Sequence, residues 1–148
     1  MTQPQTLISG GILENGTRPH ILVDDAGTIV AMSERLADVY SDHANIVDLE
    51  GRLILPSLVE PHAHLDKSLT ADIVPNPKGD LMGAILGWRD AEQSGLIAHD
   101  EMVGRITRSL EMLLASGVTL VRSHVNVGGP VSTRYLIAAM EAATAFEH

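Results

Sequence analysis

The chain has 148 residues, of which 45% are hydrophobic and 3% aromatic, a composition that supports a globular domain with an aliphatic core and excludes a disordered chain. Ten Lys and Arg residues against nineteen Asp and Glu give a formal net charge of -9 without any basic run, so no nucleic acid partner is expected. The sequence contains no cysteine, which excludes disulfides and thiolate metal sites and leaves only histidine and carboxylate groups as metal ligands.

The N-terminus and the hydropathy of the chain bear on its compartment. Residues 1–6 lack the basic stretch and the apolar segment of a signal peptide. No run approaches the ~20 apolar residues of a membrane span. The sequence therefore predicts a cytoplasmic protein without a membrane partner.

The first third of the chain, residues 6–55, alternates short apolar runs with turn-forming residues. Gly, Asn and Asp separate these runs, as in Gly10-Gly11 and in the segment 24–27, which is typical of small antiparallel strands joined by tight turns. A short helix is expected around Ser33 to Val39, with Ser33 as its N-cap. Residues 1–53 are therefore predicted to form a small β layer.

The pattern changes near Leu53, where we place the boundary to a second domain of residues 54–148. The segment from Leu53 to His64 is typical of a buried strand, and Pro56 and Pro61 predict that its ends are irregular. Further on, Val118 to Val127 is a β-branched run without internal Gly or Pro, which indicates a buried parallel strand.

Three helices are predicted in this second domain. Asp80 is expected to cap the first, and Asp100 to cap a longer second helix that Gly117 ends. Ser132 or Thr133 opens the third. The order strand, helices, strand, helix indicates β/α architecture. The apolar face of the first helix contains Leu81, Ile85 and Trp88.

His62 and His64 are the sharpest chemical feature of the sequence. Side chains at positions i and i+2 of a strand project from the same face about 6–7 Å apart at the backbone, so two imidazoles with this spacing can converge on one metal ion. Two histidines separated by one residue also occur by chance, so the surrounding residues are needed to distinguish a metal site from a chance pair.

Those surrounding residues, Leu-Pro-Ser-Leu-Val-Glu-Pro-His-Ala-His-Leu-Asp-Lys at 55–67, resemble the first-strand signature of the amidohydrolase superfamily. More narrowly, Val-Glu-Pro-His-x-His-Leu-Asp followed by Thr70-Ala71 is similar to the cytosine deaminase branch. The segment Gly-Val-Thr-Leu-Val-Arg-Ser-His-Val-Asn-Val at 117–127 is similar to the second-strand segment of that branch, which carries Thr-His-Val-Asp-Val. The resemblance covers roughly residues 53–140, and the N-terminal strands match the small β-sandwich that the superfamily places beside its barrel.

The resemblance implies the first βα units of a (β/α)8 TIM-type barrel, preceded by strands of a small β-sandwich. It also implies one divalent metal ion, zinc or iron, with His62 and His64 as two of its ligands. The other implied groups, a His and an Asp from later strands and a Glu or His for proton transfer, do not lie within residues 1–148. A complete barrel usually needs ~250 residues. We therefore expect an incomplete barrel without its catalytic acid, which needs either the remainder of the barrel or further copies of the chain as a homo-oligomer.

His124 and Asn126 share one face of the predicted second strand, at the end where active sites of barrels lie. Asn126 is expected to contact substrate. His124 is expected to contact substrate or a residue next to the metal ligands, rather than the metal itself, and a hydrogen-bonded structural role is its alternative. Asn126 stands where the cytosine deaminase pattern has Asp, and an amide does not ionise. If Asn126 lines the pocket, we expect a substrate other than cytosine, such as an aminotriazine or a modified pyrimidine. Otherwise position 126 tolerates either residue.

Asp66, Leu81 and Trp88 complete the candidate site. Asp66 and Lys67 either pair in solvent or cap a turn, or Asp66 orients a ligand imidazole without binding the metal itself. Trp88 is the only tryptophan, and we expect it to pack in the core or in a pocket wall, with stacking on substrate as the alternative. Leu81 lies on the same helical face and is a candidate for the same pocket.

The sequence as a whole predicts the N-terminal part of a hydrolase that deaminates a cytosine-like ring, a pyrimidine, a triazine or a related cyclic amidine, with metal-activated water. One alternative keeps the enzyme class and changes the substrate to a cyclic amide, as in hydantoinases and dihydroorotases. Another is an inactive structural or metal-binding module. Residues 1–148 alone are expected to have no deaminase activity.

Overall fold

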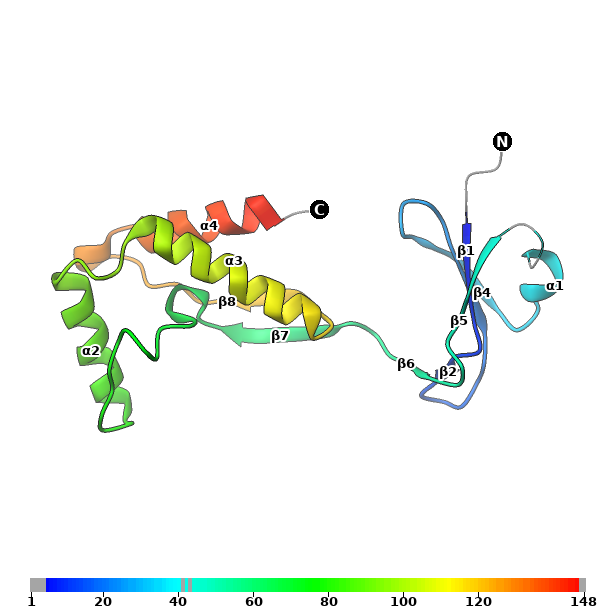
Figure 1. The fold of residues 1–148 in the computed structure, drawn as a ribbon, viewed down its shortest axis with the longest axis horizontal. Helices are drawn as coiled ribbons and strands as arrows, with labels where there is room; N and C mark the ends of the chain where they lie inside the picture. Colours follow the sequence, from blue (N-terminus) through cyan, green and yellow to red (C-terminus); the bar gives the residue numbers. More distant parts are fainter. Residues whose placement is uncertain (1–4, 41, 43, 147–148) are drawn as a thin grey trace. The chain divides into compact units, whose positions relative to one another are not determined.

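The computed structural model describes residues 5–40, 42 and 44–146, and the chain divides into two compact units between Pro56 and Ser57 (Figure 1). Four strands of the first unit form one sheet in the order β4-β3-β1-β5, while β2 pairs with β6. The side chains of Leu7 and Leu22 are buried in this unit. Its elements are β1 (Gln5–Ser9), β2 (Ile12–Leu13), β3 (His20–Val23), β4 (Ile29–Ser33), α1 (Ala37–Tyr40), β5 (Ala44–Asp48) and β6 (Leu53–Ile54).

Strand pairing in the first unit is mixed. β3 runs antiparallel to both β1 and β4, as the tight turns predict, but β5 runs parallel to β1 and β6 runs parallel to β2. A parallel neighbour requires a crossover, and the segment that contains α1 makes the crossover between β4 and β5. The prediction of antiparallel strands alone is therefore wrong for β2, β5 and β6.

The short helix α1 begins later than the sequence predicts. Ser33 is the last residue of β4, and α1 begins at Ala37. The Ser33 hydroxyl accepts a hydrogen bond from the backbone N–H of Arg35 at 3.3 Å. Ser33 therefore stabilises the turn between the strand and the helix, and its predicted role as N-cap is wrong.

The second unit is an α/β arrangement around one pair of strands. Strands β7 and β8 pair in parallel, which confirms the parallel pairing predicted for the second strand. Helix α3 lies beside β8, and α4 lies beside α3 (Figure 1). The described residues contain no closed barrel. The elements are β7 (Leu58–Ala63), the 3-10 helix η1 (Leu65–Lys67), α2 (Leu81–Gln93), α3 (His99–Ala115), β8 (Val118–Ser123), the 3-10 helix η2 (Gly129–Val131) and α4 (Arg134–Phe146).

The ends of the helices test the capping predictions. The Asp80 carboxylate accepts a hydrogen bond from the backbone N–H of Gly83 at 2.6 Å, which confirms it as the N-cap of α2. Ala98 occupies the N-cap position of α3, so the prediction of an Asp100 cap is wrong. Asp100 lies instead in the first turn, where its charge favours the positive end of the helix dipole. Gly117, with φ of 85°, follows the end of α3 as predicted.

The two predicted buried strands are shorter and more exposed in the structure. The segment from Leu53 to His64 forms two separate strands, β6 and β7, and Leu58 and Val59 are each 53% exposed. β8 ends at Ser123, four residues before the predicted end. A parallel strand is buried only where further strands and helices cover both faces of its sheet. In the described residues this sheet has only two strands.

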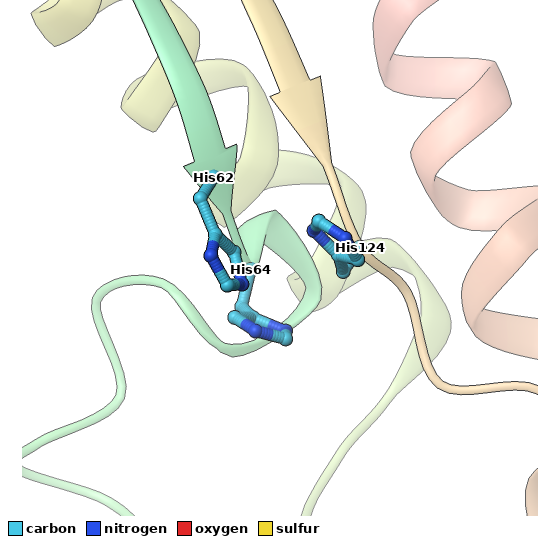
Figure 2. A group of neighbouring side chains, drawn as sticks. All are labelled: His62, His64 and His124. Atoms are coloured by element: carbon cyan, nitrogen blue, oxygen red, sulfur yellow. The ribbon is translucent and has the colours of Figure 1, made fainter.

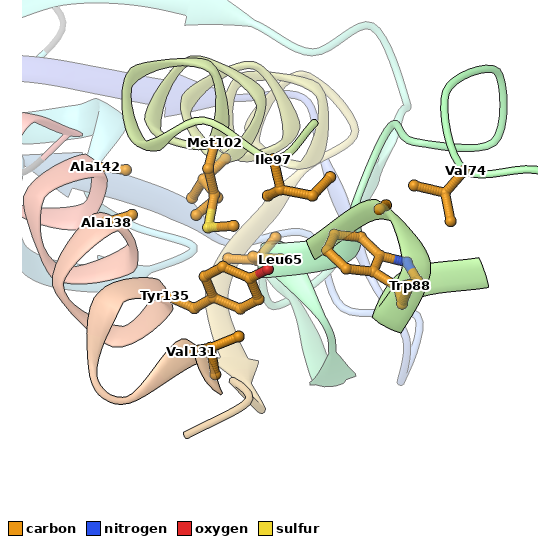
Figure 3. Close-up of a cluster of buried hydrophobic side chains, with 11 residues drawn as sticks. Leu65, Val74, Trp88, Ile97, Met102, Val131, Tyr135, Ala138 and Ala142 are labelled. Atoms are coloured by element: carbon orange, nitrogen blue, oxygen red, sulfur yellow. The ribbon is translucent and has the colours of Figure 1, made fainter. Parts of the chain in front are cut away.

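The hydrophobic core of the second unit lies between its helices and η1. Trp88 belongs to this core, and its ring meets that of Tyr135 edge-on at 6.1 Å between centroids (Figure 3). Burial raises the pKa of the Tyr135 phenol far above its ordinary value, and the nearby carboxylate of Glu92 adds to this effect. Within the described ranges, none of the helices combines the length and apolar character needed to cross a membrane.

Candidate functional site

Three histidines meet where the two parallel strands end. His62 and His64 lie at the end of β7, and His124 directly follows β8 (Figure 2). The ring centroids of His62 and His124 are 4.4 Å apart, and that of His64 lies 5.3 Å and 5.5 Å from them. One ligand atom of each histidine lies within 4.8 Å of those of the other two. We call these residues the histidine cluster.

Strand register brings the histidine cluster together. The carboxyl ends of parallel strands lie at the same edge of a sheet, so the residues after β7 and β8 become neighbours. The backbone N–H of His124 donates to the carbonyl of Ala63 at 2.8 Å, which extends the ladder one step beyond β8. The backbone N–H of Leu65 donates to the Ser123 hydroxyl at 3.1 Å. These two bonds fix the chain on both sides of the imidazoles.

The histidine cluster has the donor chemistry of a site for zinc or iron. Imidazole nitrogens suit both metals, whereas magnesium and calcium prefer oxygen ligands. A tetrahedral zinc site holds its nitrogen ligands ~2.1 Å from the metal and therefore roughly 3.4 Å from one another. Side-chain rotations can bring nitrogens that lie within 4.8 Å of one another to this spacing. All three histidines are exposed, so a substrate can reach the site.

The electrostatic surroundings favour the form of His64 that binds metal. Partial desolvation of the ring and the ammonium group of Lys67 both lower the pKa of His64, while the carboxylate of Asp66 opposes them. A lowered pKa keeps the imidazole neutral to a lower pH. Because only a neutral imidazole can ligate, His64 competes less with protons for a metal than an ordinary histidine does.

Asp66 ties together the loops that follow the two strands. Its side chain is completely buried and accepts hydrogen bonds at 3.1 Å from the Lys67 ammonium and from the backbone N–H of Asn126. The first alternative for Asp66 thus holds in part, because the ion pair with Lys67 forms, although not in solvent. Within the described residues, no hydrogen bond joins Asp66 to an imidazole, so the structure gives its proposed role in orienting a ligand no direct support.

Arg105 stabilises the turn that contains Asp66. This role was not predicted from the sequence. Its guanidinium donates to the carbonyl of Ser68 at 2.7 Å and pairs with Glu101 at 2.6 Å, while Ser109 donates to the Ser68 hydroxyl at 2.7 Å. The helical spacing of positions 102, 105, 106 and 109, which places them on one face of α3, was the signal available in the sequence, and the structure buries all four side chains. An arginine on such a face needs partners inside the fold.

A pocket of about 590 Å³ opens beside the histidine cluster, and His64 lines both. Leu81, Trp88 and Asn126, all assigned to a substrate pocket from the sequence, line it as well. His124 is not among its lining residues and lies in the histidine cluster instead. Three charged residues that were not predicted from the sequence also line the pocket: Lys67, Arg89 and Glu92.

Sequence comparison relates the chain to two hydrolases over part of their length. It is 30% identical over 83 residues to the pterin deaminase of Rhizobium rhizogenes (strain K84 / ATCC BAA-868), a match that covers 56% of this chain and 19% of that protein. It is 29% identical over 102 residues to the N-isopropylammelide isopropyl amidohydrolase of Pseudomonas sp. (strain ADP), covering 65% of this chain and 25% of that protein. No protein-family model matches the chain.

Solved structures show the same fold over nearly the whole chain. The N-isopropylammelide isopropylaminohydrolase of Burkholderia multivorans ATCC 17616 matches with a TM-score of 0.79 at 24% identity, over 99% of this chain and 35% of that protein. The guanine deaminase of C. acetobutylicum matches with a TM-score of 0.68 at 19% identity, over 96% of this chain and 33% of that protein. The two sequence relatives confirm the resemblance to the amidohydrolase superfamily indicated by the motifs around His62 and His124. The solved structures show the fold, and the chain spans about a third of their length.

Proposed function

We propose that this chain supplies the metal-binding end of a hydrolase that removes an exocyclic amino group from a cytosine-like ring, a pyrimidine, a triazine or a related cyclic amidine. The observation that carries the proposal is the histidine cluster at the ends of two neighbouring parallel strands, beside a pocket that shares His64 with it. The relatives support the reaction class, because their names give pterin and guanine as compounds that are deaminated and N-isopropylammelide as one that is hydrolysed.

In this proposal His62 and His64 hold a divalent metal, zinc or iron, and His124 is the third nitrogen donor within reach. A metal bound there would supply the Lewis acidity that makes water nucleophilic at neutral pH. The chain's own residues arrange the reactants. Leu81 and Trp88 provide an apolar wall for a planar ring, and the Asn126 side chain can donate and accept hydrogen bonds at the ring edge.

Ammonia release tests this function. It is measured with cytosine, guanine and ammelide for the longest polypeptide that contains this chain, and for residues 1–148 alone, each supplied with zinc. We expect release by the longer polypeptide, loss of that release in His62→Ala, and no release by residues 1–148, because the resemblance places the proton-transfer group elsewhere. His99→Ala, which changes an exposed histidine outside the cluster, is the matched control. Unchanged release in His62→Ala contradicts the proposal.

Asn126 gives a prediction about specificity. Asn126→Asp in the longer polypeptide is expected to raise kcat/KM for cytosine about tenfold, because a carboxylate forms charge-assisted hydrogen bonds that are stronger by about 1.5 kcal/mol than those of an amide. kcat/KM for an aminotriazine is expected to fall or stay constant in the same variant. Equal values for cytosine in the parent and the variant would show that this side chain, although it lines the pocket, does not set specificity.

A further inference from the structure

Helix α2 forms one wall of the pocket with a regular stripe of side chains. Leu81, Ile85, Trp88 and Glu92 recur every three or four positions, so they share one face of the helix, and all four line the pocket. The first three are apolar, and Leu81 and Ile85 are 76% and 50% exposed. This wall therefore offers an apolar surface that ends, one helical turn beyond Trp88, in the carboxylate of Glu92, and Arg89 of the same helix also lines the pocket.

Lys67 brings a positive charge to the same pocket from the segment that follows β7. Its ammonium nitrogen lies 5.7 Å from the Trp88 ring centroid and 3.1 Å from the Asp66 carboxylate. The Asp66 carboxylate is completely buried and holds the ammonium group in place. An ammonium group has three N–H donors, and Asp66 occupies one of them. The others remain for a ligand oxygen next to Trp88.

Glu92 has unused capacity to accept hydrogen bonds. Its side chain is half-buried, and in the described part of the chain no basic side chain lies within the 4.0 Å of an ion pair with it. Its neighbour is the buried phenol of Tyr135, whose pKa it helps to raise. A carboxylate offers about four lone-pair positions, so a single neighbouring phenol leaves room for N–H donors of a ligand.

We propose that Lys67 and Glu92 are specificity-determining residues that select planar heteroaromatic rings bearing both an oxo group and N–H donors. Lys67 donates to the oxo oxygen, Glu92 accepts from an amino group or ring N–H, and the ring lies against Trp88 and Ile85. The inference rests on the proposed function for the identity of the site. It adds the requirement for an oxo group, which the histidine cluster does not impose. A site built around charged partners discriminates strongly against analogues that lack the matching group.

Binding of three small rings distinguishes the contact made by Lys67 from the contact made by Glu92. Isocytosine carries an oxo group, an amino group and a ring N–H; 2-aminopyrimidine lacks the oxo group; 1,3-dimethyluracil has oxo groups but no N–H donor. Dissociation constants are measured on residues 1–148 in EDTA, from the fluorescence of Trp88, the only tryptophan of the chain. We expect isocytosine to bind at least tenfold more tightly than either analogue, since each charge-assisted hydrogen bond contributes roughly a factor of ten.

Each variant removes one of the two contacts and should therefore affect a different pair of rings. Lys67→Gln keeps a donor for Asp66 but removes the charge. It is expected to raise the dissociation constants of isocytosine and 1,3-dimethyluracil about tenfold and to change that of 2-aminopyrimidine by less than about twofold. Glu92→Gln should weaken the binding of isocytosine and 2-aminopyrimidine and leave the binding of 1,3-dimethyluracil unchanged. Lys78→Met and Glu111→Gln change exposed residues outside the pocket and serve as controls.

If Lys67→Gln proves unstable, the double variant Asp66→Asn/Lys67→Met removes both charges of the pair and keeps an acceptor for the Asn126 N–H. It should show the same loss for the two oxo-bearing rings. Equal binding of isocytosine and 2-aminopyrimidine by the parent chain, or equal effects of each variant on all three rings, overturns the proposal. Because EDTA removes the metal, these results are independent of whether ammonia release depends on the histidine cluster.

Discussion

Asp66→Ala is expected to lower the free energy of unfolding of residues 1–148 by about 2–4 kcal/mol, because it removes two hydrogen bonds to a buried carboxylate and the partner of a charged lysine. The Asp66 side chain is 0% exposed, and both of its hydrogen bonds measure 3.1 Å. Its loss leaves the Lys67 ammonium without its ion pair and the Asn126 N–H without an acceptor. Urea unfolding followed by the fluorescence of Trp88 measures the change.

Two further variants make the stability result specific. Asp66→Asn keeps an oxygen acceptor for the Asn126 N–H and is expected to lose less stability than Asp66→Ala. Asp72→Ala, an exposed aspartate six residues along the same segment, is expected to change the free energy of unfolding by less than about 0.5 kcal/mol. If the urea midpoint of Asp66→Ala equals that of Asp72→Ala, the stability of the two loops does not depend on the Asp66 carboxylate.

Each single substitution in the histidine cluster is expected to weaken zinc binding by more than 100-fold. Outer-shell partners of metal ligands already contribute ~10–100-fold, and a ligand removed from a site with few donors costs more. Competition with a chromophoric chelator measures the affinity for His62→Ala, His64→Ala and His124→Ala. His99→Ala, whose imidazole pairs with Glu141 outside the cluster, should bind zinc like the parent chain.

His124→Ala carries the most information in this series. The sequence predicts that His124 contacts substrate rather than metal, whereas the structure places its ring 4.4 Å from that of His62. If His124 is the third nitrogen ligand, its substitution weakens zinc binding as much as the other two. If His124→Ala binds zinc like the parent chain, the assignment to substrate stands and His62 and His64 bind the metal without it.

Local patterns in the sequence determine several features without reference to the rest of the fold. The i, i+2 spacing of His62 and His64 predicts a shared face, and their rings lie 5.3 Å apart. Asp80 caps α2 because a short acceptor directly before an apolar helix satisfies a free N–H, a purely local requirement. The resemblance of the motifs around His62 and His124 to the amidohydrolase superfamily is likewise a property of short segments.

Tertiary structure alone decides which distant residues meet. His124 joins His62 because β7 and β8 pair in parallel and in one particular register, and a shift by one residue would turn His124 to the other face. The same pairing brings the Asn126 N–H to Asp66, whose side chain is buried, whereas one of the alternatives predicted from the sequence placed it in solvent. Lys67 and Glu92 share a pocket because Trp88 of α2 packs in the same core as Leu65, two residues before Lys67. Composition and periodicity specify which face of an element is apolar, but contacts between distant segments depend on register and packing, which no local pattern encodes.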